Sequence, residues 1–275
     1  MEATAVFADV DTGVDDAIAL AYLLASPDAD LVGIASTGGN VAVQQVCRNN
    51  LALLELCGAS GVPVSKGADS PLRGPTPTAA NIHGPHGLGY AELAPGRGAL
   101  TEYDAAAAWV RAAHDHPGQL VGLVTGPLTN LALALRIEPA LPGLLRRLVI
   151  MGGSFDPADS TAPAAEFNIR TDPEAAAEVF AACETPDLQR LPIICGFELT
   201  ERIALTPAIL AGLAATAGAP AAPMSALQPP GTRSTAASPL IRLIEDAMRF
   251  YFEAHNRRGH GYLAYLHDPL AAAVA

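Results

Sequence analysis

The chain has 275 residues, half of them hydrophobic, with a formal net charge of -12 and a sequence pI near 4.9. This length and composition allow a large buried core, as one α/β domain or as a domain with a cap. The acidic balance argues against a nucleic-acid or anionic-membrane partner, because either requires a basic patch, and it disfavours a highly phosphorylated substrate.

The N-terminal stretch TAVFADVDTGVDDA, residues 4–17, joins an apolar run to a group of carboxylates. The run predicts a short buried strand that ends at the turn pair Thr12-Gly13, and helical spacing of apolar residues begins at Val14. A strand-to-helix turn lies at the carboxyl end of the sheet in an α/β protein, where ligands bind. The acidic residues placed there are Asp9, Asp11, Asp15 and Asp16.

These four acids repel one another unless a cation lies among them. Asp9 and Asp11 are expected on one face of the strand, while Asp15 and Asp16 open a helix whose positive end tolerates them. Hard divalent cations bind carboxylate oxygens, and calcium accepts roughly six to eight oxygen ligands. The alternative is that Asp15 caps the helix while the other three acids are solvated. This alternative is less favoured, because Asp9 and Asp11 directly follow an apolar run rather than lying in a polar loop. The stretch predicts a divalent metal site.

Two other interpretations of this stretch are weak. DVDTG is similar to the DxDxT start of haloacid-dehalogenase-type phosphatases, which also need a later lysine and a further acidic pair. The single lysine here is Lys66, in PVSKGAD, and no plausible GDxxxD follows it. An EF-hand loop would require a glycine and a glutamate where this chain has Val14 and Leu20.

The rest of the chain alternates apolar runs, glycine turns and helical periodicity. Further strands are expected over 30–37, 62–64, 119–124, 148–151 and 191–195. Helices are expected over 41–57, 101–114 (begun by a capping box at Thr101–Asp104), 128–137 and 240–257. The repeated order predicts an α/β fold with a mainly parallel, open, Rossmann-like sheet and helices on both faces.

Two segments lack periodicity. Residues 66–98 are rich in Gly, Pro and His, and composition alone favours equally a flap over the strand ends and a surface loop. Residues 216–239 form a flexible link rich in Ala, Pro, Ser and Gly. The helix after this link carries Phe250, Tyr251 and Phe252, and we expect at least one of them in the core.

The cysteines show neither a CxxC pair nor zinc-ligand spacing, so we expect buried, reduced thiols at Cys47, Cys57, Cys183 and Cys195. The first strand starts too early to leave room for a targeting peptide, and no apolar run has membrane-spanning length. These features predict a soluble, cytoplasmic protein with no membrane partner.

A second polar motif lies in AAEFNI. Glu166 and Asn168 are two residues apart, so in an extended chain they face the same way, with Phe167 opposite. A carboxylate and an amide directed together at a crevice suit a polyol such as ribose. A loop that hydrogen-bonds to itself is the alternative.

Six motifs in chain order, DVDTGVDDA, GGN, VTGPLTNLALAL, MGG, AAEFNIRTDPEAA and HDPLA, resemble the inosine-uridine preferring nucleoside hydrolases. The resemblance runs from Asp9 to Ala273 and implies one domain over 1–275. It also implies Ca²⁺-dependent hydrolysis of ribonucleosides to ribose and free base, with a small-molecule nucleoside as substrate. Relatives are usually oligomeric, so a homo-oligomer, dimer or tetramer, is expected.

The resemblance also implies roles for individual residues. The calcium ligands would be the carboxylates of Asp11, Asp16 and Asp268 and the backbone carbonyl of Thr125. The 2′- and 3′-hydroxyls of ribose would be held by Asp15, Asn40 and Asn168, with Met151 nearby. Glu166 would bind the 5′-hydroxyl, and His83 would be the histidine of the flap.

The expected chemistry passes through an oxocarbenium-like ribosyl cation. Asp11 would accept a proton from the attacking water, and His267 would be the acid that protonates the leaving base near neutral pH. In the family, a histidine just before the last metal aspartate marks the inosine-uridine branch, and a tryptophan there would suggest the purine-specific branch.

The chain departs from the family pattern at three places. Thr12 replaces the usual proline, which is expected to loosen the turn slightly, and Ser160 replaces a usual asparagine, which could weaken the contact with the 5′-hydroxyl. The chain also ends soon after HDPLA, so either a terminal element is lacking or the sequence is a fragment. A catalytically weak relative that binds nucleosides or ribose stays open as the alternative function, and base preference would depend on the flap near His83 and the helix near Tyr251.

Overall fold

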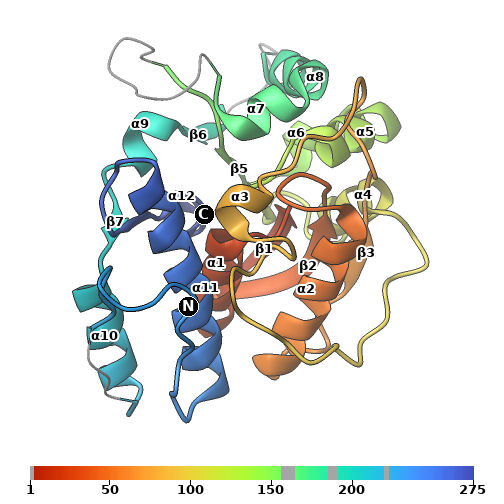
Figure 1. Ribbon diagram of the computed structural model, residues 1–275. Coiled ribbons are helices and arrows are strands. Elements are labelled where there is room, and N and C mark those ends of the chain that lie inside the picture. Colours follow the sequence, from red (N-terminus) through yellow and green to blue (C-terminus); the bar gives the residue numbers. More distant parts are fainter. Residues whose placement is uncertain (1–2, 156–164, 185–190, 220–222) are drawn as a thin grey trace.

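The computed structural model describes residues 3–155, 165–184, 191–219 and 223–275. Within these ranges the main sheet has six strands, all paired in parallel, in the order β3-β2-β1-β4-β5-β6 (Figure 1). They are β1 (Thr4–Val10), β2 (Ala29–Ser36), β3 (Val64–Lys66), β4 (Val121–Val124), β5 (Arg147–Met151) and β6 (Ile193–Cys195). The α/β fold with a parallel sheet is confirmed.

Helices cover both faces of this sheet (Figure 1). They are α1 (Val14–Ala25), α2 (Val43–Leu56), α3 (Ala80–His83), α4 (Ala105–Asp115), α5 (Thr129–Ile137), α6 (Leu141–Leu144), α7 (Phe167–Thr171), α8 (Pro173–Cys183), α9 (Phe197–Thr200), α10 (Pro207–Thr216), α11 (Pro239–Arg257) and α12 (His267–Val274). A separate antiparallel pair joins β7 (Ala204–Leu205) to β8 (Ala264–Tyr265). No helix in the described part of the chain is long and apolar enough to cross a membrane.

The strand order reverses beside β1. The chain runs from β1 through β2 to β3 on one side, and from β4 through β5 to β6 on the other. Such a reversal leaves a crevice at the carboxyl ends of the two central strands, and ligands of open α/β sheets bind there. Asp11 follows the end of β1 and Thr125 follows the end of β4, so both lie at this crevice.

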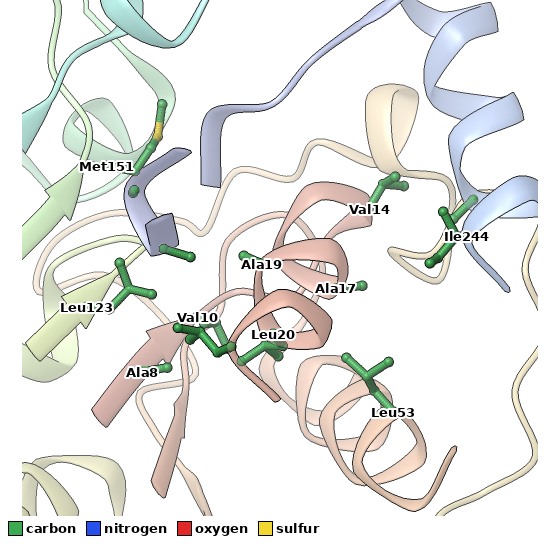
Figure 2. Packing of buried hydrophobic residues seen from close by; sticks show 14 of the residues in the cluster. Ala8, Val10, Val14, Ala17, Ala19, Leu20, Leu53, Leu123, Met151 and Ile244 are labelled. Carbon is green, nitrogen blue, oxygen red and sulfur yellow. The ribbon is translucent and has the colours of Figure 1, made fainter. Parts of the chain in front are cut away.

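Two hydrophobic clusters hold the sheet between its helices. Side chains alternate along a strand, so Ala8 and Val10 face one cluster, which includes Leu20 of α1, whereas Phe7 faces the other, which includes Trp109 of α4. Figure 2 shows the first cluster, in which β1, β4 and β5 contribute from the sheet and α1, α2 and α11 contribute from the helices. The start of α1 is therefore fixed against the carboxyl end of β1.

Several predicted boundaries were wrong. The N-cap of α4 is Asp104, whose carboxylate accepts a hydrogen bond from Ala107 N at 2.8 Å, so the helix begins later than the capping box predicted. The hydroxyl of Thr101 instead donates to the carbonyl of Tyr103 at 2.7 Å. The third strand is displaced to Val64–Lys66, and strand pairing with β2, which sequence periodicity does not report, fixes its position.

The C-terminal helix expected over 240–257 is present as α11, and it buries both Tyr251 and Phe252. The segment before it is not wholly irregular. Its first residue, Thr216, ends α10, and Ser234 N donates to Asp246 of α11 at 2.6 Å. All four cysteines are free; three are buried and Cys57 is half-buried.

Candidate active site

Three buried carboxylates meet where α1 and α12 begin. Asp15 and Asp16 lie in the first turn of α1, and Asp268 lies in the first turn of α12. One oxygen from each lies within 4.8 Å of the others. Like charges this close, removed from water, disfavour ionisation. Burial, followed by the charge of Asp16, raises the pKa of Asp15 to about 7, and burial and Asp15 raise the pKa of Asp268 well above its ordinary value.

Asp11 adjoins these three residues, and we call Asp11, Asp15, Asp16 and Asp268 the acidic cluster. Burial and the charge of Asp16 also raise the pKa of Asp11 well above its ordinary value. Its carboxylate accepts hydrogen bonds from Asn40 N at 2.7 Å and from Asn40 Nδ2 at 3.2 Å. A Cβ at Gly39 would lie 2.1 Å from Asp11 Oδ2, so the GGN turn has to be glycine there.

One oxygen of the acidic cluster has no hydrogen-bond partner. In the described part of the chain, Asp15 Oδ1 is the buried side-chain polar atom without one. The nearest basic atom is His83 Nδ1 at 3.7 Å, but this nitrogen accepts the hydrogen bond of Val14 N at 3.1 Å. Burial also lowers the pKa of His83 to about 3, so its imidazole is neutral and makes no ion pair with Asp15 at pH 7. Asp15 Oδ1 is thus available to a ligand.

Thr125 and Asn168 close the other side of the site. The Thr125 hydroxyl donates to Asp16 Oδ1 at 2.7 Å, and the Thr125 carbonyl accepts from Asn168 Nδ2 at 2.7 Å. The same amide group lies 3.2 Å from the carbonyl of Met151, at the end of β5. Three strand ends thus place polar groups around the acidic cluster.

The predicted geometry of Glu166 and Asn168 was wrong. They do not lie in an extended chain, because Glu166 is the N-cap of α7 and Asn168 lies in its first turn. The Glu166 carboxylate accepts hydrogen bonds from Asn168 N at 2.8 Å and from Ile169 N and Gly153 N at 3.2 Å each. A carboxylate just before a helix satisfies the free backbone N–H groups of the first turn. Both side chains nevertheless reach the same pocket.

This pocket has a volume of about 480 Å³, and residues of the acidic cluster form part of its lining. Its lining also includes Asn40, Thr125, Met151, Glu166 and Asn168. Aromatic and imidazole rings of the lining belong to His83, Phe197, Tyr251, His255, Tyr265 and His267, and Tyr251 Oη lies 3.4 Å from Asp15 Oδ2. Carboxylates, amides and rings in one pocket suit a ligand that has both hydroxyl groups and a planar ring.

His267 differs from its predicted state. Its Nδ1 lies 2.7 Å from the hydroxyl of Thr200, and its ring stacks on Phe197 at a centroid distance of 5.1 Å and an interplanar angle of 14°. Burial, followed by the charge of His255, lowers the pKa of His267 to about 3. This shift is away from the titration near neutral pH that the sequence predicted for His267.

Asp9 lies apart from the acidic cluster, although the sequence grouped them. The Asp9 side chain points to the face of the sheet that Trp109 covers, and Trp109 Nε1 donates a hydrogen bond to it at 2.8 Å. Asn130 Nδ2 also donates to it at 3.0 Å, and the Thr37 hydroxyl is a third donor. Asp11 does not share this face, because β1 ends at Val10 and the chain turns.

The remaining observations concern Thr12, Ser160 and three residues that sequence reasoning did not select. The Thr12 hydroxyl donates to Asn50 of α2, so this turn is anchored rather than loosened. Ser160 lies outside the described residues. Sequence reasoning did not select His255, although it lies one helical turn after Tyr251 and thus on the same face of α11. Thr200 and Phe197 carried no signal, since α9 is a single short turn.

A sequence model of the inosine-uridine preferring nucleoside hydrolases matches residues 6–275. The chain belongs to this family. It is 33% identical over 264 residues to Uridine nucleosidase 1 of Arabidopsis thaliana, covering 96% of this chain and 71% of that protein. It is 40% identical over 211 residues to the Non-specific ribonucleoside hydrolase RihC of Escherichia coli, covering 76% of this chain and 66% of that protein.

Solved structures agree with this assignment. The purine-preferring ribonucleoside hydrolase from Gardnerella vaginalis superimposes with a TM-score of 0.83 at 29% identity, covering 98% of this chain and 79% of that one. A plant nucleoside hydrolase, the PpNRh1 enzyme, gives a TM-score of 0.82 at 29% identity, covering 98% of this chain and 78% of that one. The chain is thus a nucleoside hydrolase, an enzyme that cleaves N-glycosidic bonds.

Proposed function

We propose that this nucleoside hydrolase is a calcium-dependent enzyme that converts ribonucleosides of the inosine and uridine type, with a purine or pyrimidine base, to ribose and free base. The observation that carries the proposal is the unpartnered Asp15 Oδ1 in a buried acidic cluster, which lines a pocket together with aromatic and imidazole rings. A cytoplasmic location and a homo-oligomeric state stay predictions from the sequence and the resemblance.

The residues of the site fit a hard divalent cation. The acidic cluster supplies buried carboxylate oxygens that repel one another, and a cation relieves this repulsion. Asp11, Asp16 and Asp268 would hold the ion together with the Thr125 carbonyl. When bound, the cation supplies Lewis-acid chemistry that polarises a water molecule and ribose hydroxyls.

The polar side chains of the pocket would bind the ribose. Asp15 would accept a hydrogen bond from a ribose hydroxyl at Oδ1, and Asn40 and Asn168 would bind the 2′- and 3′-hydroxyls, with Met151 as an apolar neighbour. Glu166 would accept a hydrogen bond from the 5′-hydroxyl, because its carboxylate lines the pocket as well as capping α7. The aromatic walls, among them His83, would stack on the base.

Two side chains would transfer protons. Asp11 accepts a proton from water as the water oxygen bonds to C1′ of the ribose. The bond between C1′ and the base nitrogen breaks, and its electron pair stays on the base. His267 would donate a proton to that base, which requires the imidazolium form although burial lowers the pKa of His267 to about 3.

The decisive experiment is a reducing-sugar assay on inosine, uridine, cytidine and adenosine, with calcium and then with a chelator. We expect ribose release that stops on chelation and returns with calcium, and the ranking of substrates gives the base preference. Release that persists in chelator would refute the metal requirement. Calorimetry that shows tight nucleoside binding without any release would instead support a binding protein.

A further inference from the structure

His255 lines the pocket with one of its ring nitrogens already engaged. It lies one helical turn after Tyr251 on α11, and its Nδ1 is 3.0 Å from the backbone carbonyl oxygen of Tyr251. A carbonyl oxygen can only accept a hydrogen bond, so Nδ1 carries the hydrogen of this contact. In a neutral His255 the tautomer is therefore fixed: Nδ1 is the donor, and Nε2 has a lone pair.

Three neighbouring rings hold the imidazole in this orientation. The rings of Tyr251, Tyr265 and His260 meet it edge to face, at centroid distances of 4.5, 5.4 and 5.9 Å. In the described part of the chain Nε2 has no hydrogen-bond partner, but it is not one of the buried side-chain atoms that lack a partner. His255 lines the pocket, so Nε2 is open to a ligand there.

The position of His255 on α11 suits the base of a nucleoside. Tyr251 Oη lies 3.4 Å from Asp15 Oδ2, so Tyr251 adjoins the acidic cluster. His255 follows Tyr251 by four residues, about 6 Å further along the helix axis at a rise of about 1.5 Å per residue. The base is bonded directly to C1′ of the ribose. A ribose bound at Asp15 therefore brings its base within reach of this next helical turn.

The bases differ in the group that they present to a lone pair. Uracil has an N–H at ring position 3, and hypoxanthine has an N–H at ring position 1. Cytosine and adenine have a lone pair at these same positions. Two lone pairs that face each other, away from water, leave a hydrogen bond unmade on both sides, and this disfavours binding in the ground state and in the transition state.

We propose that His255 is a specificity-determining residue: its Nε2 accepts a hydrogen bond from the ring N–H of uracil or hypoxanthine and thereby disfavours cytosine and adenine. The inference rests on the proposed function and deepens it by naming a residue that distinguishes the bases. The contact involves no proton transfer, so it requires only a neutral imidazole. Burial lowers the pKa of His255 to about 4, and even its ordinary value of 6.5 leaves the ring mostly neutral at pH 8.

The first test compares uridine with cytidine at pH 8, in the unmodified enzyme and in His255→Phe, which keeps a flat ring but has no lone pair. We expect the unmodified enzyme to have the higher kcat/KM on uridine. In His255→Phe the uridine-to-cytidine ratio of kcat/KM should fall at least about tenfold, because the unmade hydrogen bond no longer penalises cytidine. The inosine-to-adenosine ratio should fall in the same way. Reducing-sugar release measures all four rates.

His260→Phe is the matched control, because it makes the same replacement at a neighbouring imidazole. His260 also lines the pocket and contacts the ring of His255, but no hydrogen bond within the described residues fixes its tautomer. We expect the uridine-to-cytidine ratio to change less than about threefold in this variant. Each ratio is taken within one variant, so a general loss of folded enzyme cancels, and thermal unfolding shows that each variant folds.

A second test locates the contact from the side of the substrate. 3-Methyluridine has a methyl group in place of the hydrogen on N3, so it cannot donate to Nε2 and would clash with the imidazole. It should be a poor substrate of the unmodified enzyme. His255→Ala makes room for the methyl group and should raise kcat/KM on 3-methyluridine relative to uridine at least about tenfold, whereas His260→Ala should not.

Equal kcat/KM on uridine and cytidine in the unmodified enzyme, or an unchanged ratio in His255→Phe, would refute the role of His255. An equal fall in His260→Phe would also refute it, as would the absence of any gain on 3-methyluridine in His255→Ala. These outcomes differ from failure of the proposed function, in which the unmodified enzyme itself would release no ribose from any nucleoside.

Discussion

Asp9 and Asp15 are both buried carboxylates of the same N-terminal stretch, yet their surroundings differ. Asp9 accepts hydrogen bonds from Thr37, Trp109 and Asn130, so both of its oxygens are satisfied by the protein. Asp15 faces other carboxylates and keeps one oxygen without a partner. A buried carboxylate whose oxygens all accept hydrogen bonds from the protein has a structural role. A buried carboxylate that lacks a hydrogen-bond partner and lies among like charges indicates a ligand-binding role.

The Asp9 contacts support the crevice from the opposite face of the sheet. They connect β1 to α4 through Trp109 and to α5 through Asn130. Asn130 Oδ1 in turn accepts from Ala68 N at 2.9 Å, which fixes the start of the 66–98 segment. The two regions therefore have different roles: Asp9 holds the strand ends in place, and the acidic cluster supplies carboxylate oxygens for a ligand.

The largest expected effect comes from breaking the acidic cluster. Asp11→Ala should lower kcat on nucleosides at least about a thousandfold, because it removes the proton acceptor for water together with a metal ligand. Reducing-sugar release measures this loss. Asp28→Ala, at an exposed position, is the control and should keep full activity. Near-normal turnover of Asp11→Ala would contradict the mechanism.

Metal removal gives the next largest effect, and it depends on pH. The pKa of Asp15 is raised to about 7 in the folded protein, above its ordinary value of 3.8, so between these values the folded state binds a proton that the unfolded state has released. In chelator, the protonated Asp15 therefore stabilises the folded state below pH 4, and this contribution is lost as the pH rises to 7. The free energy of unfolding should fall by about 1.4 kcal/mol per pH unit for one proton.

Thermal unfolding at pH 5 and pH 7.5, with and without calcium, measures this dependence. Calcium binds the ionised carboxylates, so its stabilisation should grow with pH over the same range. Asp9 also has a raised pKa, about 6, caused mainly by burial, and its share of the loss should persist in saturating calcium. A chelated protein that becomes more stable toward pH 7 would overturn this account of the acidic cluster.

The smallest expected effect concerns the satisfied carboxylate. Asp9→Asn replaces one accepting oxygen by an NH₂ group, which then faces a hydrogen-bond donor. The free energy of unfolding should therefore fall by about 3 kcal/mol. Calcium affinity should change little, because Asp9 lies outside the acidic cluster. Denaturant unfolding and calcium titration measure the two quantities, with Asp28→Asn as the control. Loss of calcium binding in folded Asp9→Asn would mean that the two regions are not separate.

Much of the fold could be predicted from local pattern. Short apolar runs between glycine turns gave most strands of the sheet to within a few residues, because a parallel strand buried on both faces is apolar throughout. The long amphipathic α11 was also clear. The geometry at Glu166 could not be predicted, because a carboxylate two residues before an amide fits both an extended chain and a helix cap. The free backbone N–H groups at the start of α7 favour the cap.

The sequence by itself determined the α/β class, the carboxylates at the end of β1 and the six motifs of the family, because strand periodicity and motif order are local properties of the chain. The family resemblance already grouped Asp268 with Asp11 and Asp16. Only the tertiary structure separated Asp9 from Asp15, and the packing of α1 against α12 placed Asp268 beside Asp15 and Asp16. It also decided the state of His267, since burial and the contact with Thr200 arise from residues far away in the chain.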